Sequence, residues 1–332
     1  MKNAIIEKGA THVGLSKEDV DRIEREVSSE TGFAADGEVQ RRFIYDPDKT
    51  WRVRIRGTFE GKPAQLRIEN LKLEIDEESI REKFRAQVAG SKVRPPLTYQ
   101  TRSFDDAKGY GWSLDEDVGG KSLFDPSGSA AEAVAAFVPF YRAYRDAVRE
   151  PFWPASEGDA VAFTRAQLEK WEEIARSQDP VRVNRFSDMA ERLKGAMLGR
   201  LTGKPLVFQH AHLTGNDVRI AADGAYVVFA NHFWSWRQPG YDVSFSIWGQ
   251  WLALPDGKRT PDAVKAITSA WLDAVERDLE DLVAPDAVLT MLLNRLYGSL
   301  LLDIPAQRHQ RSPESVAALE TACIAEADRL LG

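Results

Sequence analysis

Two short apolar runs, each followed by polar residues, decide the fold of this chain. They read VFQHAHLTGNDV over residues 207–218 and VVFANHFW over residues 227–234, with an Asp223–Gly224 pair between them. Asp-Gly is a typical hairpin turn, so we expect segments 206–209 and 226–230 to form a small hairpin. Polar side chains at the ends of short strands commonly face a cleft, which makes this stretch the candidate site.

Histidine is concentrated in the same stretch, which holds His210, His212 and His232 of the five in the chain. Asp217 and Asn231 complete the set of candidate residues. Residues 210 and 212 would share one face of a strand, so with Asp217 or His232 they could bind Zn²⁺. Nothing else in the sequence has the spacing of a metal hydrolase, and the zinc site therefore stays a minor alternative.

The region before this stretch has the period of two that is typical of strands. We expect an antiparallel sheet with one helix in an N-lobe over residues 37–118, preceded by a helical extension over residues 1–36 that opens with a capping box at Ser16. The predicted strands span 39–45, 50–57, 64–70, 97–102 and 111–114, and the predicted helix spans 77–89.

Helical spacing dominates from residue 119 to residue 332, and the fold class is therefore α+β with a helical C-lobe that contains the hairpin at 206–231. Prolines 261 and 313 stand where the first turn of a helix tolerates proline. The predicted helices span 129–149, 159–176, 183–201, 261–282, 285–302 and 312–331.

Composition excludes several classes of protein. The chain has 332 residues, is 43% hydrophobic and has one cysteine, so a disordered chain or a disulfide scaffold is excluded. Its net charge of −7 argues against a nucleic-acid partner. No apolar run reaches the roughly 18–20 residues of a membrane span, and residues 1–8 lack the apolar core of a signal peptide. We expect a cytoplasmic protein with no membrane partner.

The candidate stretch resembles the catalytic segment of the aminoglycoside phosphotransferase and choline kinase family, which has the two-lobed protein-kinase-like fold. The family pattern is His-Gly-Asp-x-x-x-x-Asn, followed about fourteen residues later by Ile-Asp-Trp. Aligned without gaps, His210 takes the place of the histidine, His212 that of the catalytic aspartate and Asp217 that of the metal-binding asparagine. Asn231 then takes the place of the second metal ligand, and Asp242 that of the aspartate that braces the catalytic loop.

The order of the upstream elements also resembles that of the family, and the likeness spans about residues 39–254. Arg67 stands on the third strand, where the family has the cation that binds phosphate, and Glu82 stands in the helix that supplies its glutamate partner. Residues 112–120 resemble the segment beside adenine, which implies that Glu116 and Val118 contact the nucleotide. The resemblance implies ATP and Mg²⁺ as cofactors and a small-molecule hydroxyl as acceptor.

Departures from the family pattern shape the functional hypotheses. Asp217 and Asn231 have exchanged the amide and the carboxylate of the usual metal ligands, so the ligand charge is unchanged. His212 would serve as the base through its neutral imidazole, but it would not attract a cationic acceptor as aspartate does. The turn at 46–49 lacks the glycine that lets backbone N–H groups approach phosphates.

Two functions from different classes follow. The first is an ATP-dependent phosphotransferase that moves a γ-phosphoryl group to a substrate hydroxyl, with His212 as base and His210 orienting the loop. The second is a catalytically silent kinase-like module that binds a nucleotide or a partner. The sequence identifies neither the acceptor nor the oligomeric state.

Overall fold

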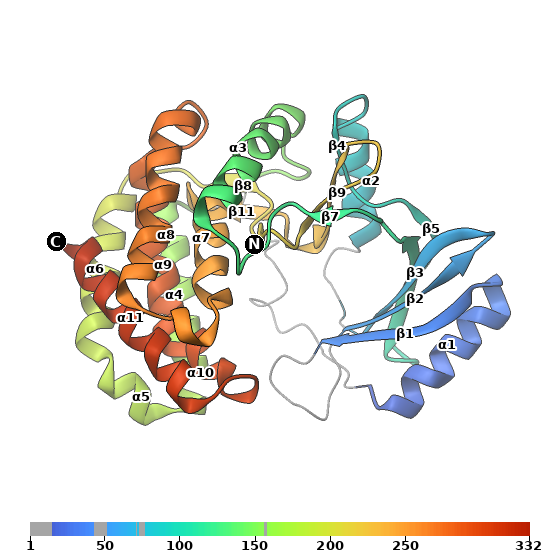
Figure 1. The fold of residues 1–332 in the computed structure, drawn as a ribbon, viewed down its shortest axis with the longest axis horizontal. Helices are drawn as coiled ribbons and strands as arrows, with labels where there is room; N and C mark the ends of the chain where they lie inside the picture. Colours follow the sequence, from blue (N-terminus) through green and yellow to red (C-terminus); the bar gives the residue numbers. More distant parts are fainter. Residues whose placement is uncertain (1–14, 43–51, 71, 73–76, 156–157) are drawn as a thin grey trace. The chain divides into compact units, whose positions relative to one another are not determined.

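The chain divides into two compact units, shown in Figure 1. The computed structural model describes residues 15–42, 52–70, 72, 77–155 and 158–332. A sheet unit lies within residues 4–120 and 220–232, and a helical unit lies within residues 121–219 and 233–332. The predicted α+β class, with an antiparallel sheet in the N-terminal part and a helical C-terminal part, is confirmed.

The sheet unit is built on a five-stranded antiparallel sheet with the order β1-β2-β3-β6-β5. Helix α2 (Glu77–Gln87) follows β3 in the chain. The turn predicted at 46–49 lies outside the described residues. The strands are β1 Ala34–Arg42, β2 Arg52–Phe59, β3 Lys62–Glu69, β5 Thr98–Asp105 and β6 Tyr110–Glu116.

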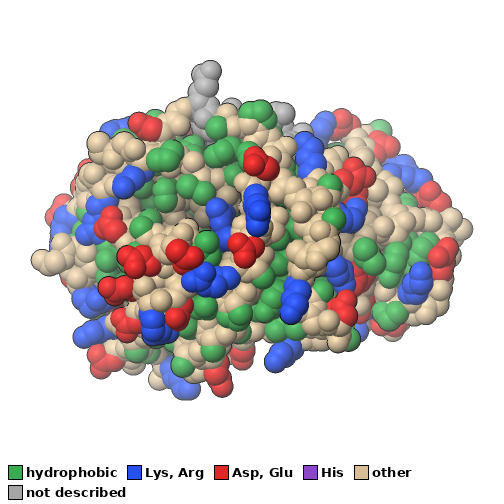
Figure 2. All heavy atoms as spheres, turned by 90° about the horizontal axis from the view of Figure 1, so that it is seen from above, with side chains coloured by type: hydrophobic (Ala, Val, Ile, Leu, Met, Phe, Trp, Pro, Cys, Tyr) green, Lys and Arg blue, Asp and Glu red, His purple; other side chains and the backbone are tan. Residues whose placement is uncertain are grey.

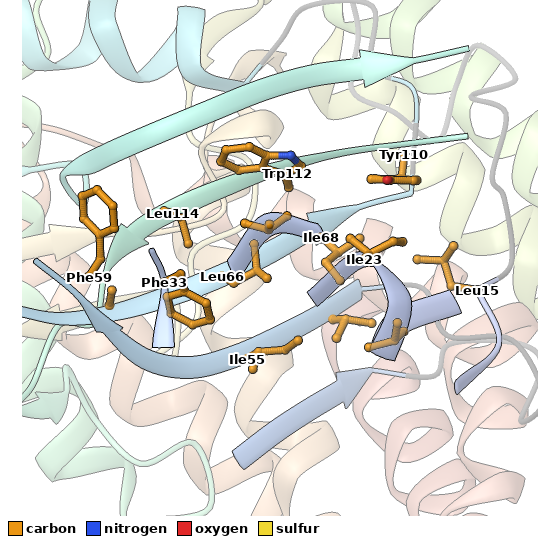
Figure 3. Close-up of a cluster of buried hydrophobic side chains, with 14 residues drawn as sticks. Leu15, Ile23, Phe33, Ile55, Phe59, Leu66, Ile68, Tyr110, Trp112 and Leu114 are labelled. Carbon is orange, nitrogen blue, oxygen red and sulfur yellow. The ribbon is translucent and has the colours of Figure 1, made fainter. Parts of the chain in front are cut away.

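Alternation along β3 gives the sheet two different buried faces. Ala64, Leu66 and Ile68 belong to an apolar cluster with residues of β2 and β6, and Figure 3 shows Leu66 and Ile68 beside Ile23 of helix α1 (Lys17–Thr31). Arg67 lies on the opposite face, because successive strand residues point to opposite sides. One face of the sheet is therefore an apolar core, and the other carries buried charge.

Helix α1, which begins after Ser16 as predicted, belongs to the sheet unit. Val20, Ile23 and Val27 are spaced by three and four residues, and all are buried in the cluster on the sheet. The predicted capping box is confirmed, because Ser16 Oγ accepts a hydrogen bond from the Asp19 N–H and Asp19 accepts one from the Ser16 N–H.

The helical unit contains one more long helix than predicted. Helix α7 (Tyr241–Ala253) is buried on almost every side, so it lacks the polar face that marks a helix in a sequence. The predicted helix at 183–201 is broken at Phe186. The other long helices are α3 Ala130–Ala147, α4 Ala160–Gln178, α6 Ser187–Leu201, α8 Pro261–Ala274, α9 Pro285–Gly298 and α11 Pro313–Leu331.

The predicted pairing of segments 206–209 and 226–230 is wrong. Strand β8 (Val207–Gln209) pairs antiparallel with β11 (Ser235–Arg237), and strand β10 (Tyr226–Val228) pairs in parallel with β4 (Val93–Arg94). The predicted turn at Asp223–Gly224 exists, but it leads into β10 from β9 (Val218–Ile220). Strands of three residues carry too little sequence information to fix their partners.

One helical segment among the described residues, Pro285–Ala306, is long and apolar enough to cross a membrane by length and composition. Of its most apolar window, 78% is buried inside the protein. Burial of this extent is what the central helix of a globular core requires, since such a helix is apolar on all sides.

Candidate functional site

Strand β8 leads directly into the candidate catalytic loop, and the side chain of Asp242 holds the start of that loop. Asp242 Oδ1 accepts the N–H of Ala211 at 2.6 Å, and Oδ2 accepts the N–H of His210 at 3.2 Å and the hydroxyl of Tyr144 at 3.0 Å. The predicted bracing role of Asp242 is thereby confirmed. Its own N–H donates to Gln209 Oε1 at 3.1 Å, so both strand and loop are tied to the start of α7.

Burial strongly affects the carboxyl group of Asp242, which is 0% exposed. Loss of water raises its pKa to about 6, although the Ala211 N–H, the Arg145 guanidinium, the Tyr144 hydroxyl and the His210 N–H all favour the ionised form. The carboxylate is therefore ionised at neutral pH, but only by a margin of about one unit.

Ala211 adopts a left-handed backbone conformation, with φ of 64°. The family pattern has glycine at this position, which reaches positive φ without a Cβ clash. Alanine in this conformation costs about 1–2 kcal/mol. The two hydrogen bonds that Asp242 accepts from residues 210 and 211 hold the backbone there.

His212 and Asp217 form a hydrogen-bonded pair within the loop. His212 Nδ1 lies 3.2 Å from Asp217 Oδ2, which also accepts the Thr214 N–H at 2.8 Å and the Thr214 hydroxyl at 2.6 Å. Burial opposes ionisation of Asp217, but the charge and hydrogen bond of His212 and the Thr214 hydroxyl outweigh it and lower the pKa to about 2. An ionised Asp217 only accepts, so Nδ1 of His212 must carry the hydrogen.

Aromatic rings fix the orientation of the His212 imidazole. It stacks on the Phe233 ring at 4.1 Å between centroids with an interplanar angle of 7°, and Phe245 of α7 lies 4.6 Å away. The His212 side chain is 21% exposed. In the neutral imidazole whose Nδ1–H donates to Asp217, Nε2 has a lone pair that can accept a proton.

His210 has a structural position. It is 0% exposed, its N–H donates to Tyr144 and Asp242, and its ring meets Trp234 edge to face at 5.3 Å. These contacts agree with a residue that orients the loop.

In the sheet unit, Arg67 pairs with Glu77 at 2.7 Å, and both side chains are buried. The predicted partner, Glu82, is exposed on α2, so the prediction of an Arg67–Glu82 pair is wrong. The helical period explains the difference. Glu77 lies on the same face as Ile80 and Phe84, which are buried, and Glu82 lies on the other face.

A second buried arginine extends this network. Arg81 Nη1 donates to Asp115 Oδ1 at 2.7 Å, and Arg81 Nη2 donates to Asp115 Oδ2 at 3.2 Å. Nη2 also lies 3.5 Å from Glu77 Oε1. Arg67 is also bound by Glu69 at 2.7 Å and lies 3.6 Å from Asp115. Burial opposes ionisation of the acids, but the two arginines outweigh it and lower the pKa of Asp115 and of Glu77. Neither Arg81 nor Asp115 was predicted.

Glu77 also binds the segment that follows β10. It accepts the N–H of Asn231 at 3.1 Å and lies 3.3 Å from Nδ1 of His232. Asn231 is 0% exposed, and its amide Nδ2 donates to the Val228 carbonyl at 2.9 Å. One glutamate therefore links the phosphate-binding candidate Arg67 to the metal-binding candidate Asn231 within the sheet unit.

Glu116 is the last residue of strand β6, and its carboxylate and backbone N–H both form hydrogen bonds. Its carboxylate makes two bonds of 2.7 Å to Arg94, and its N–H donates to the Leu97 carbonyl at 2.8 Å. Val118, two residues later, is buried. A contact from Glu116 to a nucleotide would therefore have to use its backbone carbonyl.

No cluster of three or more His, Cys, Asp or Glu side chains suited to a metal ion occurs in the part of the chain that the structure describes. This finding opposes the zinc alternative, since such a site needs three protein ligands. Of the two predicted metal ligands, Asp217 is the one that supplies a charged oxygen to a hard cation. It is ionised, and its Oδ1 accepts no hydrogen bond from a described residue.

No protein-family model matches the sequence, and no curated protein sequence matches it. Solved structures do resemble it. A thermostable mutant of aminoglycoside phosphotransferase APH(4)-Ia in complex with ADP and hygromycin B has a TM-score of 0.61 and 16% identity, covering 92% of this chain and 98% of that one.

Two further structures agree. Choline kinase LicA from Streptococcus pneumoniae has a TM-score of 0.55 and 12% identity, covering 94% of this chain and 98% of that one. A putative aminoglycoside phosphotransferase from Ralstonia eutropha JMP134 has a TM-score of 0.53 and 13% identity, covering 94% and 97%. The chain therefore has the protein-kinase-like fold of the aminoglycoside phosphotransferase and choline kinase structures, at low sequence identity.

Proposed function

We propose that this protein is a phosphotransferase that moves the γ-phosphoryl group of ATP to a hydroxyl group of a small molecule. The observation that carries the proposal is the braced loop that orients His212 through Asp217. The neighbouring structures support it, since one holds ADP with hygromycin B and another is a choline kinase.

His212 is the general base in this proposal. Its Nδ1–H donates to Asp217, and its Nε2 accepts the proton of the acceptor hydroxyl as the oxygen attacks phosphorus. The stacking on Phe233 limits rotation of the His212 ring, so the imidazole loses little conformational entropy when the reacting complex forms. His210 orients the loop from its buried position. A base of this kind contributes about 10²–10⁴-fold to the rate.

Asp217 and Asn231 are the proposed ligands of Mg²⁺. Asp217 supplies an ionised oxygen, Oδ1, and the family pattern assigns the amide oxygen of Asn231 to the same ion. When bound, Mg²⁺ would neutralise phosphate charge. Because the carboxylate stands at position 217, Asp217 has two proposed roles: Oδ1 binds Mg²⁺ and Oδ2 orients His212.

Arg67 is the proposed phosphate-binding cation, and Glu77 replaces Glu82 as the residue that positions it. The backbone of Glu116 and Val118 is proposed to contact the adenine. Because His212 does not add negative charge as an aspartate would, the acceptor is expected to be a neutral alcohol rather than a polycation.

The test is ADP formation from ATP and Mg²⁺ with hygromycin B, choline and a set of neutral polyols as acceptors. His212→Ala should lower turnover by about 10²-fold or more. Asn216→Ala is the matched control, since Asn216 is exposed in the same loop and should keep turnover within about twofold. Equal turnover in His212→Ala and the wild type would contradict the assignment of the base.

A second function, a catalytically silent kinase-like binding module, is favoured by the charge around Arg67. Two buried arginines, Arg67 and Arg81, share the three carboxylates of Glu69, Glu77 and Asp115. These two arginines and three carboxylates sum to one negative charge, which opposes phosphate binding by Arg67. Nucleotide binding without turnover on any acceptor would support this function.

A further inference from the structure

A cavity of about 330 Å³ lies inside the helical unit and is separate from the exposed edge of His212. Its wall is formed by the C-terminal ends of α3 and α6, by β8, and by the loop and first turns that begin α9. Figure 2 shows a hollow with Lys and Arg side chains beside it on the face seen from above. Its volume is at the lower end of the range for small-molecule sites.

Three cations line this cavity against one carboxylate: Arg145, Arg200 and Lys204 against Asp286. Arg200 Nη1 is 3.6 Å from Asp286 Oδ1, which is too long for a hydrogen bond, and this buried nitrogen has no hydrogen-bond partner among the described residues. Within the described chain, no carboxylate forms an ion pair with Arg145 or Lys204. The lining is therefore net positive, although Arg145 also interacts with the buried carboxylate of Asp242 outside the lining.

The start of α9 adds to this potential. Ala284, the N-cap residue, and Ala287 both line the cavity, and no side chain caps the helix. Pro285 has no N–H, and the Ala287 N–H donates to the Ala284 carbonyl at 3.0 Å, so the contribution of this helix is its dipole. The positive end of a helix dipole favours an anion. The rest of the wall is largely apolar, with Leu201, Val207 and Val283 among its residues.

We propose that this cavity binds a small organic anion, a carboxylate or phosphate ester attached to an apolar body. The anionic group would pair with Arg200 and Lys204, and the apolar body would lie against Leu201 and Val283. Charge-assisted hydrogen bonds from a guanidinium whose Nη1 makes no hydrogen bond within the described chain are among the strongest contacts available to such a ligand.

The position of the cavity links its ligand to the catalytic loop. Gln209, a lining residue, accepts the N–H of Asp242 and donates to the Gln238 carbonyl at 2.8 Å. Arg145, another lining residue, donates to the Phe208 carbonyl at 3.2 Å and follows Tyr144, which bonds to Asp242. An anion here shares its cavity with residues that hold the loop, and His212 is not among the lining residues, so it acts as a ligand distinct from the acceptor.

Calorimetric titration of the full chain with phenyl phosphate, benzoate and neutral benzyl alcohol, without nucleotide, tests the proposal. The two anions should each saturate one site, and benzyl alcohol should bind about tenfold more weakly or worse. The double variant Arg200→Gln/Lys204→Gln should weaken anion binding by about tenfold. Arg192→Gln is the matched control. Arg192 is exposed on α6, the helix that also holds Arg200, and it forms an ion pair with Asp328, so this variant should bind the anions as the wild type does.

Lys204→Gln alone, at an exposed position, provides the same test if the double variant does not fold. Equal binding of benzyl alcohol and the anions, unchanged binding in the charge variants, or no saturable binding to the wild type would overturn the proposal. Preference for phenyl phosphate over benzoate would identify a phosphate ester, and the reverse a carboxylate. Because no nucleotide is present, the outcome is independent of the proposed phosphotransferase activity.

Discussion

Replacing Asp242 with asparagine should remove a specific pH dependence from the stability of this protein. Asp242 is 0% exposed, and burial raises its pKa from 3.8 to about 6. Between pH 4 and pH 6 the folded state therefore holds a proton that the unfolded state has lost. The stability that this proton contributes is present below about pH 4 and is lost as pH rises through about 6.

The size of the effect follows from the two pKa values. A difference of about two units at about 1.4 kcal/mol each corresponds to about 3 kcal/mol of unfolding free energy. Asparagine keeps the shape of the side chain but cannot titrate, so the Asp242→Asn variant should lack this decline. The amide N–H groups of asparagine would face the donors of residues 210 and 211 and could lower stability. That change is the same at every pH, so it shifts the curve of unfolding free energy against pH without altering its slope.

Urea unfolding of both proteins at intervals from pH 4 to pH 8 measures the slope. Asp217→Asn is the control at a second, half-buried aspartate. The pKa of Asp217 is lowered to about 2, so its contribution is lost only as pH falls below about 4. This control should keep the wild-type decline between pH 4 and pH 6. Parallel curves for the wild type and Asp242→Asn would refute the reasoning.

Three further predictions concern the stability of variants. Glu77→Gln should destabilise the sheet unit by about 3–5 kcal/mol in urea unfolding, because it breaks a buried ion pair. Glu82→Gln, at an exposed position, should change stability by less than about 0.5 kcal/mol. Equal effects of the two variants would contradict the Arg67–Glu77 pairing. Ala211→Gly should change stability by less than about 1 kcal/mol, because relief of the left-handed strain of about 1–2 kcal/mol is offset by the entropy cost of glycine and by loss of a buried methyl group; a loss of more than about 2 kcal/mol would show that Ala211 is not strained. Gly240→Ala should lower the melting temperature markedly, because its Cβ would lie 2.5 Å from the Ala287 backbone at a φ of 81°; an unchanged melting temperature would contradict this contact.

The sequence predicted the elements whose periodicity is strong. The strands at 64–70 and 111–114 and the helix at 77–89 have apolar residues at regular spacing, and the structure has strands and a helix there. The bracing role of Asp242 came from resemblance to a family pattern, and the hydrogen bonds to residues 210 and 211 confirm it.

Other features depend on contacts that no local pattern records. Helix α7 is buried on nearly all sides, so its sequence shows no polar face. The pairing of β8 with β11 brings Phe208 opposite Trp236, and the two rings meet edge to face at 5.7 Å between centroids. Glu77 could have been preferred to Glu82 from the helical period of Ile80 and Phe84. The pairing of His212 with Asp217 depends on a loop conformation that sequence spacing does not specify.

The most direct test of the central claim is calorimetric titration of ATP into the full chain with and without Mg²⁺. We expect binding that depends on Mg²⁺, and loss of that dependence in Asp217→Asn. Asp273→Asn, which removes an exposed carboxylate on α8, is the matched control and should bind as the wild type. Failure of ATP to bind in either condition would contradict the account, and binding that is indifferent to Mg²⁺ would remove the metal role of Asp217 and favour a silent module.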